Sequence, residues 1–171
     1  MARLLALGLF LLLTSGIASA ETRDVSQHFF DPKLGDFKAE LATAKQEGKQ
    51  GILLMFEQED CPFCRRMKTT ILNQSEVQDY YHKHFLIFSV DVKGATALVD
   101  FNGKDTNDKQ FAVDHRVRAT PVFLFFDLSG KPISRFTGAA KDIDEFMKLG
   151  HYVVEGAYKN MPFTKYKQQG G

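Results

Sequence analysis

Three short apolar runs, each bounded by turn or helix signals, limit most strongly how this chain can fold. They are Gly51–Phe56, Phe85–Val92 and Pro121–Phe126. Apolar runs of this length are typical of strands that are buried on both faces, as in the centre of a sheet with helices above and below it. We therefore expect an α/β fold built on a central sheet.

Helix signals precede the first run and fill the intervals between the runs, and a last helix is expected over residues 141–158. The candidate N-terminal caps are Asp36, Ser75 with Gln78, and Asn107 with Gln110, the two pairs having the spacing of a capping box. Helices that connect the first two runs predict parallel strands, whereas the Ser129-Gly130 turn predicts an antiparallel last strand at 133–137. The sheet should be mixed, with helices on both faces and a small hairpin or irregular insertion at 93–106.

The first twenty residues have the pattern of an export signal. Arg3 gives a positive start, Leu4–Leu13 is a continuous apolar run, and Ala18-Ser19-Ala20 is a small-residue cleavage site. The apolar run is shorter than the roughly 20 residues that span a bilayer, which disfavours a retained anchor. We expect cleavage after Ala20 and a periplasmic location.

The remaining 151 residues suffice for one domain with its own core. We expect a polar lead at 21–35, whose Phe29 and Phe30 contact the domain edge, a domain at 36–160 and a tail at 161–171. Loss of Arg3 with the signal leaves 21 basic and 21 acidic side chains. This balance provides no basic footprint for nucleic acid or an acidic membrane surface, so those partners are not expected.

The only two cysteines, Cys61 and Cys64, stand three residues apart. A disulfide that closes so short a loop removes little entropy from the unfolded chain, so structural stabilisation explains the pair poorly. Pro62 is suited to the first position of a helix, because its missing N–H needs no partner there. The pair is therefore expected to open a helix and to have a chemical role.

A helix N-terminus stabilises a thiolate, and the thiolate is the species that attacks a disulfide. Cys61 gains most from this position and is the expected nucleophile. Cys64, one turn into the helix and less accessible, is the expected resolving thiol. Phe63, which lies between the two cysteines, is expected at the active-site surface rather than in the core.

These features resemble the thioredoxin superfamily: a strand, then Cys61-Pro62-Phe63-Cys64 at a helix start, then Arg118-Ala119-Thr120-Pro121 before an apolar strand. The likeness spans about residues 36–158 and implies a thioredoxin-like fold. The residues around the motif are similar to those of periplasmic SoxW-type thioredoxins. The resemblance also implies a cis peptide bond before Pro121 and substrate contacts from Thr120, Pro121, Pro62 and Phe63, with the Thr120 backbone pairing with an extended substrate segment.

The chain departs from the family at two positions. Met55 stands where thioredoxins keep a buried acid, and Asp60 replaces the tryptophan that usually precedes the motif. Glu57 follows two residues later on the same strand face and is a candidate proton acceptor for Cys64. A surface carboxylate at a strand end is an equally good interpretation, because glutamate is seldom fully buried.

The resemblance implies a thiol-disulfide oxidoreductase that needs no cofactor beyond the Cys61–Cys64 pair. A reductase of disulfides in periplasmic client proteins is favoured over an isomerase, which usually adds a dimerisation module, and we expect a monomer. Sulfur-oxidation proteins and cytochrome maturation are both candidate client systems, and a membrane thiol reductase is the expected electron donor. The opposite direction, as an oxidant, stays open.

A different class of function is metal binding or metal delivery through Cys61 and Cys64. His82 and His84 would complete a set of four zinc ligands. The spacing argues against it, because residues two apart on a helix or strand do not share one face and the interval does not match zinc-finger patterns. We therefore expect no metal site of this kind, while copper or zinc delivery by the two cysteines alone stays open as a minor alternative.

Overall fold

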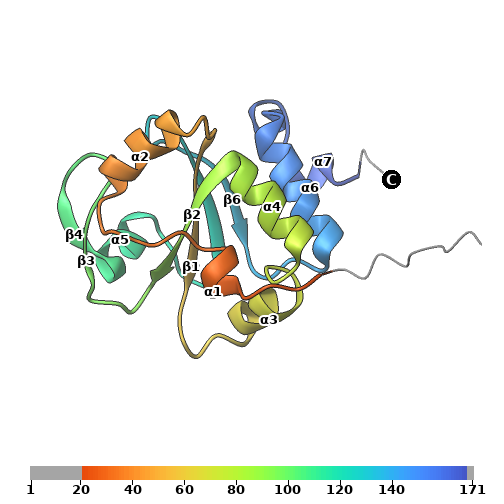
Figure 1. The fold of residues 1–171 in the computed structure, drawn as a ribbon, viewed down its shortest axis with the longest axis horizontal. Helices are drawn as coiled ribbons and strands as arrows, with labels where there is room; N and C mark the ends of the chain where they lie inside the picture. Colours follow the sequence, from red (N-terminus) through yellow and green to blue (C-terminus); the bar gives the residue numbers. More distant parts are fainter. Residues whose placement is uncertain (1–20, 169–171) are drawn as a thin grey trace, which may run out of the picture.

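The computed structural model describes residues 21–168, so the predicted export signal lies outside the described residues. Within the described part, no helix is both long and apolar enough to cross a membrane. Figure 1 shows the arrangement of the elements. In chain order they are α1 Val25–His28, α2 Phe37–Gln46, β1 Gly51–Glu57, α3 Pro62–Thr70, α4 Ser75–His84, β2 Phe85–Asp91, β3 Ala97–Val99, β4 Asp105–Asn107, α5 Asp108–Asp114, β5 Val122–Asp127, β6 Pro132–Thr137, α6 Ile143–Val154, the 3-10 turn Ala157–Lys159 and α7 Phe163–Tyr166.

The central sheet has four strands in the order β2-β1-β5-β6. Strand β1 runs parallel to β2 and antiparallel to β5, and β6 returns antiparallel to β5, which confirms the predicted mixed sheet. Strand β1 begins at Gly51, where an added Cβ would lie 1.9 Å from the carbonyl oxygen of Phe126. Only glycine allows β5 to approach this closely.

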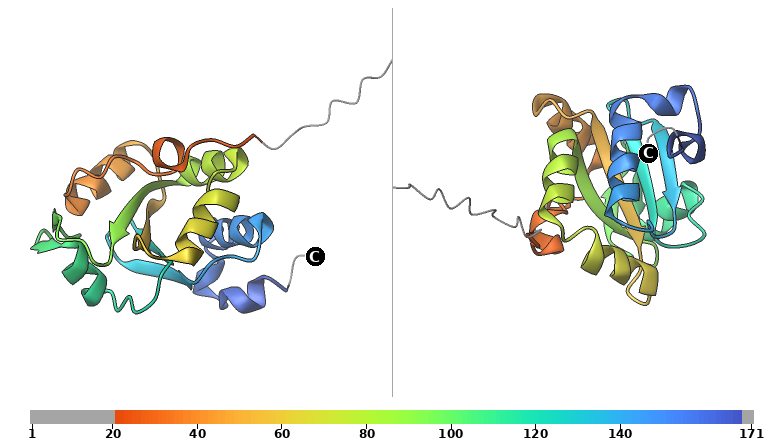
Figure 2. Two further views of the ribbon diagram at one scale, coloured as in Figure 1. Left: turned by 90° about the horizontal axis from the view of Figure 1, so that it is seen from below. Right: turned by 90° about the vertical axis from the view of Figure 1, so that its right-hand side faces the viewer.

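Helices cover both faces of the sheet, as predicted, and each face has its own apolar cluster (Figures 1 and 2). One face packs against α2, α5 and the β3–β4 hairpin, and includes Leu54 and Phe56 of β1. The other face packs against α3, α4 and α6, and includes Leu53 and Met55. Alternate residues of β1 therefore enter different clusters, and the strand is fixed from both sides.

The lead at 21–35 is attached to the domain by backbone and side-chain contacts. Phe29 is fully buried in the cluster that also contains Cys61 and Cys64, which places it deeper than the predicted edge contact. The N–H of Asp31 donates to the Ile87 carbonyl at 2.7 Å, and the Asp31 carboxylate accepts from the Ile87 N–H at 2.7 Å. These bonds cover part of the outer edge of β2.

The predicted capping box at Ser75 and Gln78 is wrong. Gln74 occupies the cap position of α4 without a side-chain cap bond, and the Ser75 N–H donates instead to the Glu21 carbonyl at 2.9 Å. Gln78 is buried and donates to the Leu72 carbonyl at 2.9 Å. A partner from the distant lead segment replaces the local cap, which local sequence patterns do not show.

Other boundaries differ by a few residues. Helix α6 ends at Val154 rather than near Tyr158, because Gly156 adopts a left-handed conformation. The segment 93–106 forms the small β3–β4 hairpin. Asn107 caps α5 through the Gln110 N–H, as predicted, although the Gln110 side chain does not return the bond.

Burial of Phe29 generates a test of whether the lead belongs to the cooperative fold. We expect Phe29→Ala to lower the free energy of unfolding by about 3–5 kcal/mol, because it leaves a cavity in the core. Leu34→Ala is the control, since Leu34 in the same segment is 84% exposed. Urea unfolding would measure both variants, and equal stabilities would show that the lead is not part of the cooperative unit.

Candidate active site

The cysteine motif opens helix α3, as predicted. Strand β1 ends at Glu57, a short loop follows, and Cys61 takes the N-cap position with Pro62 at the start of the helix. Cys61 and Cys64 form a disulfide, with their Cα atoms 5.2 Å apart. The buried strand and the helix start together hold the pair beyond the carboxyl end of β1, which is an inner strand of the sheet.

The Cys61 sulfur is the one that receives a backbone hydrogen bond. The Cys64 N–H donates to the Cys61 Sγ at 3.0 Å. This N–H is one of the first donors of the helix, which have no carbonyl partner within the helix. Cys61 is 4% and Cys64 2% exposed in this oxidised form, so both sulfurs are largely covered. Phe63 is 60% exposed beside them and lies at the surface, as predicted.

Thr120 and Pro121 lie on the β5 side of the disulfide. The peptide bond between them is cis, as the resemblance implies. Pro121 is buried and Thr120 half-buried, and β5 begins at the next residue, where Val122 pairs with Phe56 near the end of β1. The loop before β5 therefore adjoins the end of the strand that leads to Cys61.

Glu57 takes part in a polar network on the other side of the disulfide. Its carboxylate accepts hydrogen bonds from the Lys68 Nζ at 2.7 Å and from the Ser89 hydroxyl at 2.5 Å. The side chain is 14% exposed, while Met55 on the same strand face is fully buried. The buried position on this strand face is therefore apolar, and the carboxylate of Glu57 lies at the border of the site, where Lys68 balances its charge.

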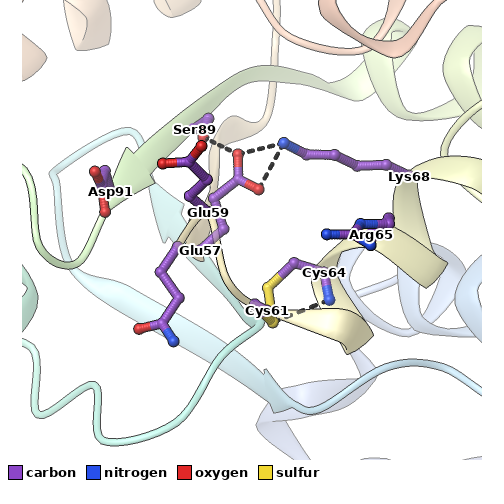
Figure 3. A pocket seen from close by; sticks show the side chains of 9 residues that line it. Glu57, Glu59, Cys61, Cys64, Arg65, Lys68, Ser89 and Asp91 are labelled. Carbon is purple, nitrogen blue, oxygen red and sulfur yellow. Dashed lines mark hydrogen bonds and ion pairs between the residues drawn. A yellow bond between two sulfur atoms is a disulfide. The ribbon is translucent and has the colours of Figure 1, made fainter.

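The network forms part of a pocket of about 350 Å³ beside the disulfide (Figure 3). Both cysteines contribute to its wall, together with charged and polar side chains from the β1 end, the following loop, α3 and β2. The lining residues are Glu57, Gln58, Glu59, Cys61, Cys64, Arg65, Lys68, Ser89 and Asp91. Neither Thr120 nor Pro121 contributes to it.

Lys68, Ser89 and Arg65 were not identified as site residues from the sequence. Lys68 follows Cys64 by four residues, so helical spacing offered one signal that it lies on the same face of α3. Ser89 offered no such signal, because its approach to Glu57 depends on the register between β1 and β2. Charged residues on an exposed helix are usually solvated, which made Arg65 inconspicuous.

His82 and His84 lie far from the cysteines, so the four side chains do not form one ligand set. His84 ends α4 immediately before Phe85, which pairs with Gly51 at the start of β1, whereas Cys61 follows the end of that strand. The histidines and cysteines therefore lie at opposite ends of β1. Within residues 21–168, no group of three or more His, Cys, Asp or Glu side chains is arranged to hold a metal ion.

The comparisons agree with this architecture. A family model for a thioredoxin-like domain matches residues 37–154. A thioredoxin-fold protein from Helicobacter pylori superposes with a TM-score of 0.64 at 21% identity, covering 86% of this chain and 92% of that one. A thioredoxin from Thermus thermophilus gives a TM-score of 0.54 at 27% identity, covering 70% and 84%. A DsbH oxidoreductase gives 0.51 at 22% identity, covering 90% and 96%. The comparison with curated proteins finds no significant match.

The hydrogen bond to the Cys61 sulfur predicts unequal reactivity of the two thiols. After reduction, we expect iodoacetamide at neutral pH to alkylate Cys61 about tenfold faster than Cys64, because the helix N-terminus stabilises the Cys61 thiolate. Mass spectrometry of the digested protein at short times would measure the ratio. Faster labelling of Cys64 would contradict the assignment.

Proposed function

The chain belongs to the thioredoxin-like family and is a thiol-disulfide oxidoreductase through its Cys61–Cys64 pair; from this premise we propose that it reduces disulfide bonds in exported proteins. The observation that carries the proposal is the position of Cys61. It caps helix α3 and accepts the Cys64 N–H, so the thiolate that must attack a client disulfide is stabilised where it forms.

The reaction proceeds in two exchanges. The Cys61 thiolate attacks one sulfur of the client disulfide and displaces the other sulfur, which leaves as a thiolate and takes up a proton. Cys64 then loses its proton and attacks the Cys61 Sγ, which releases the first client sulfur. The client has gained two electrons and two protons, and the Cys61–Cys64 disulfide remains to be reduced by a donor.

We infer the reductive direction because, beyond the helix start itself, few groups are placed to stabilise the Cys61 thiolate. Strong oxidants of this kind owe their potential to a highly stabilised thiolate. Here one hydrogen bond to the Cys61 sulfur is found among residues 21–168. Glu59, whose carboxylate has no ion-pair partner in that range, places negative charge in the preceding loop, whereas Asp60 is paired with Lys93 at 3.8 Å. The Arg66 guanidinium donates to the Lys141 carbonyl at 2.6 Å rather than to the cysteines. These features favour a reductant.

The predicted export signal is the basis for proposing a periplasmic location, and the resemblance of the motif residues to SoxW-type thioredoxins is the basis for proposing clients among sulfur-oxidation proteins. Proteins of cytochrome maturation are the second candidate class of clients, because the same reduction of disulfides would serve them. A membrane thiol reductase would regenerate the reduced pair, and the protein would act as a monomer. Phe63 and Pro62 would contact the client surface, while Thr120 and Pro121 would receive its extended segment.

Glu57 is proposed as the acceptor of the Cys64 proton. It lines the same pocket as Cys64, and its ion pair with Lys68 holds the carboxylate in that pocket. This arrangement offers a replacement for the buried acid whose position Met55 occupies.

Trapping of clients tests the proposed function directly. In Cys64→Ser the second exchange cannot occur, so we expect disulfide-linked clients to accumulate on Cys61 in the exported fraction. Cys61→Ser is the matched control and should trap none. Non-reducing electrophoresis after acid quenching would show the adducts, and their absence from Cys64→Ser would count against the function.

A second variant tests the proton acceptor. Glu57→Gln should slow the decay of the mixed disulfide about tenfold or more, because a positioned general base contributes on the order of 10²–10⁴ in rate. The control is Asp91→Asn, since Asp91 pairs with Glu57 in the strand register and lines the same pocket. Quenched-flow mass spectrometry with a peptide disulfide would follow the intermediate. Equal decay rates in the two variants would eliminate this role for Glu57.

A further inference from the structure

The disulfide lies between two different surroundings, one on each side of β1. Thr120 and Pro121 precede β5 on one side, where an extended protein segment would be received. The pocket of about 350 Å³ lies on the other side, against the end of β2, and neither Thr120 nor Pro121 lines it. Pockets for small molecules measure about 300–1,000 Å³, so this one has the size for a small ligand.

Charges of both signs in the pocket are not used by the protein itself. Glu57 and Lys68 neutralise each other. By contrast, the Arg65 guanidinium and the Glu59 carboxylate have no hydrogen-bond or ion-pair partner in the part of the chain that the structure describes, and both are exposed. In Figure 3 they lie on opposite sides of Glu57, with the disulfide below.

We propose that this pocket binds the disulfide of an α-amino acid thiol, namely cystine, as a low-molecular-weight substrate. Arg65 would hold an α-carboxylate through its planar pair of N–H donors, and Glu59 would hold an α-ammonium group. Cys61 and Cys64 both line the pocket, so a ligand held by these two groups would place its own disulfide beside the cysteine pair. The proposal rests on the reductive direction of the proposed function.

The reaction balances without a further reactant. The Cys61 thiolate attacks one cystine sulfur, the S–S bond of cystine breaks, and one cysteine leaves as a thiolate that takes up a proton. Cys64 then gives up its proton and attacks the Cys61 Sγ, which releases the second cysteine. One cystine becomes two cysteines, and the protein dithiol becomes the Cys61–Cys64 disulfide.

The test compares cystine with bis(2-hydroxyethyl) disulfide, which lacks both charged groups. Cystine carries no net charge at neutral pH, so a preference for it would not arise from long-range attraction. The rate at which each disulfide oxidises the reduced protein is measured by stopped flow. It is divided by the rate at which the same disulfide oxidises dithiothreitol, which removes the difference in intrinsic reactivity between the two disulfides. We expect a normalised preference for cystine of about fivefold or more, in line with two charge pairs at a partly exposed site.

Substitutions then locate the preference. Arg65→Gln and Glu59→Gln should each lower it by about three- to fivefold. The controls are Arg66→Gln and Asp60→Asn, which remove the neighbouring charges that do not line the pocket. The preference is the ratio of the two normalised rates in the same variant. A substitution that changes the general reactivity of Cys61 alters both rates equally and leaves this ratio unchanged.

The outcomes separate this proposal from the proposed function. A wild-type protein that reduces protein disulfides without preferring cystine overturns the cystine site and leaves the proposed function intact. Equal losses of preference in Arg65→Gln and Arg66→Gln also overturn the site. A protein that reduces neither cystine nor protein disulfides overturns both.

Discussion

Burial of strand β1 on both faces is the constraint on which the site depends. Leu53 and Met55 enter one apolar cluster, Leu54 and Phe56 enter the other, and the strand is paired on both edges. Such a strand has little freedom to shift, because a slip of one residue would exchange the two buried faces. Its carboxyl end therefore holds Cys61 in a fixed relation to β2 on one side and β5 on the other.

The polar part of the site begins where this buried strand ends. The interior beside the cysteines is apolar at Met55, and the carboxylate stands two residues further along, where Glu57 reaches solvent, Lys68 and Ser89. A charged acid at the edge avoids the desolvation cost of a buried one and is paired there. The result is a polar pocket next to the disulfide, on the side opposite Thr120 and Pro121.

Features that depend on local chemistry were predictable from the sequence. The apolar runs indicated the central strands, Asp36 and Asn107 indicated helix starts, and Pro62 placed Cys61 at a cap. Features that depend on distant partners were not predictable. At the start of α4, Gln74 rather than Ser75 takes the cap position, and the Ser75 N–H donates to the carbonyl of the distant Glu21.

The same distinction applies within the site. The helix start and the exposed Phe63 followed from the motif itself, and the cis bond before Pro121 followed from the family resemblance. The bonds of Glu57 to Lys68 and Ser89 require the packing of α3 on the sheet and the β1–β2 register. No local pattern in the sequence determines either.

We propose that the Cys61–Cys64 pair donates electrons to disulfides. The equilibrium potential of the pair against a glutathione or dithiol buffer tests it most directly. Reducing thiol-disulfide oxidoreductases have reduction potentials of about −270 mV, and strongly oxidising ones have potentials of about −120 mV. We expect a potential more negative than about −200 mV; a less negative value would contradict the reductase assignment.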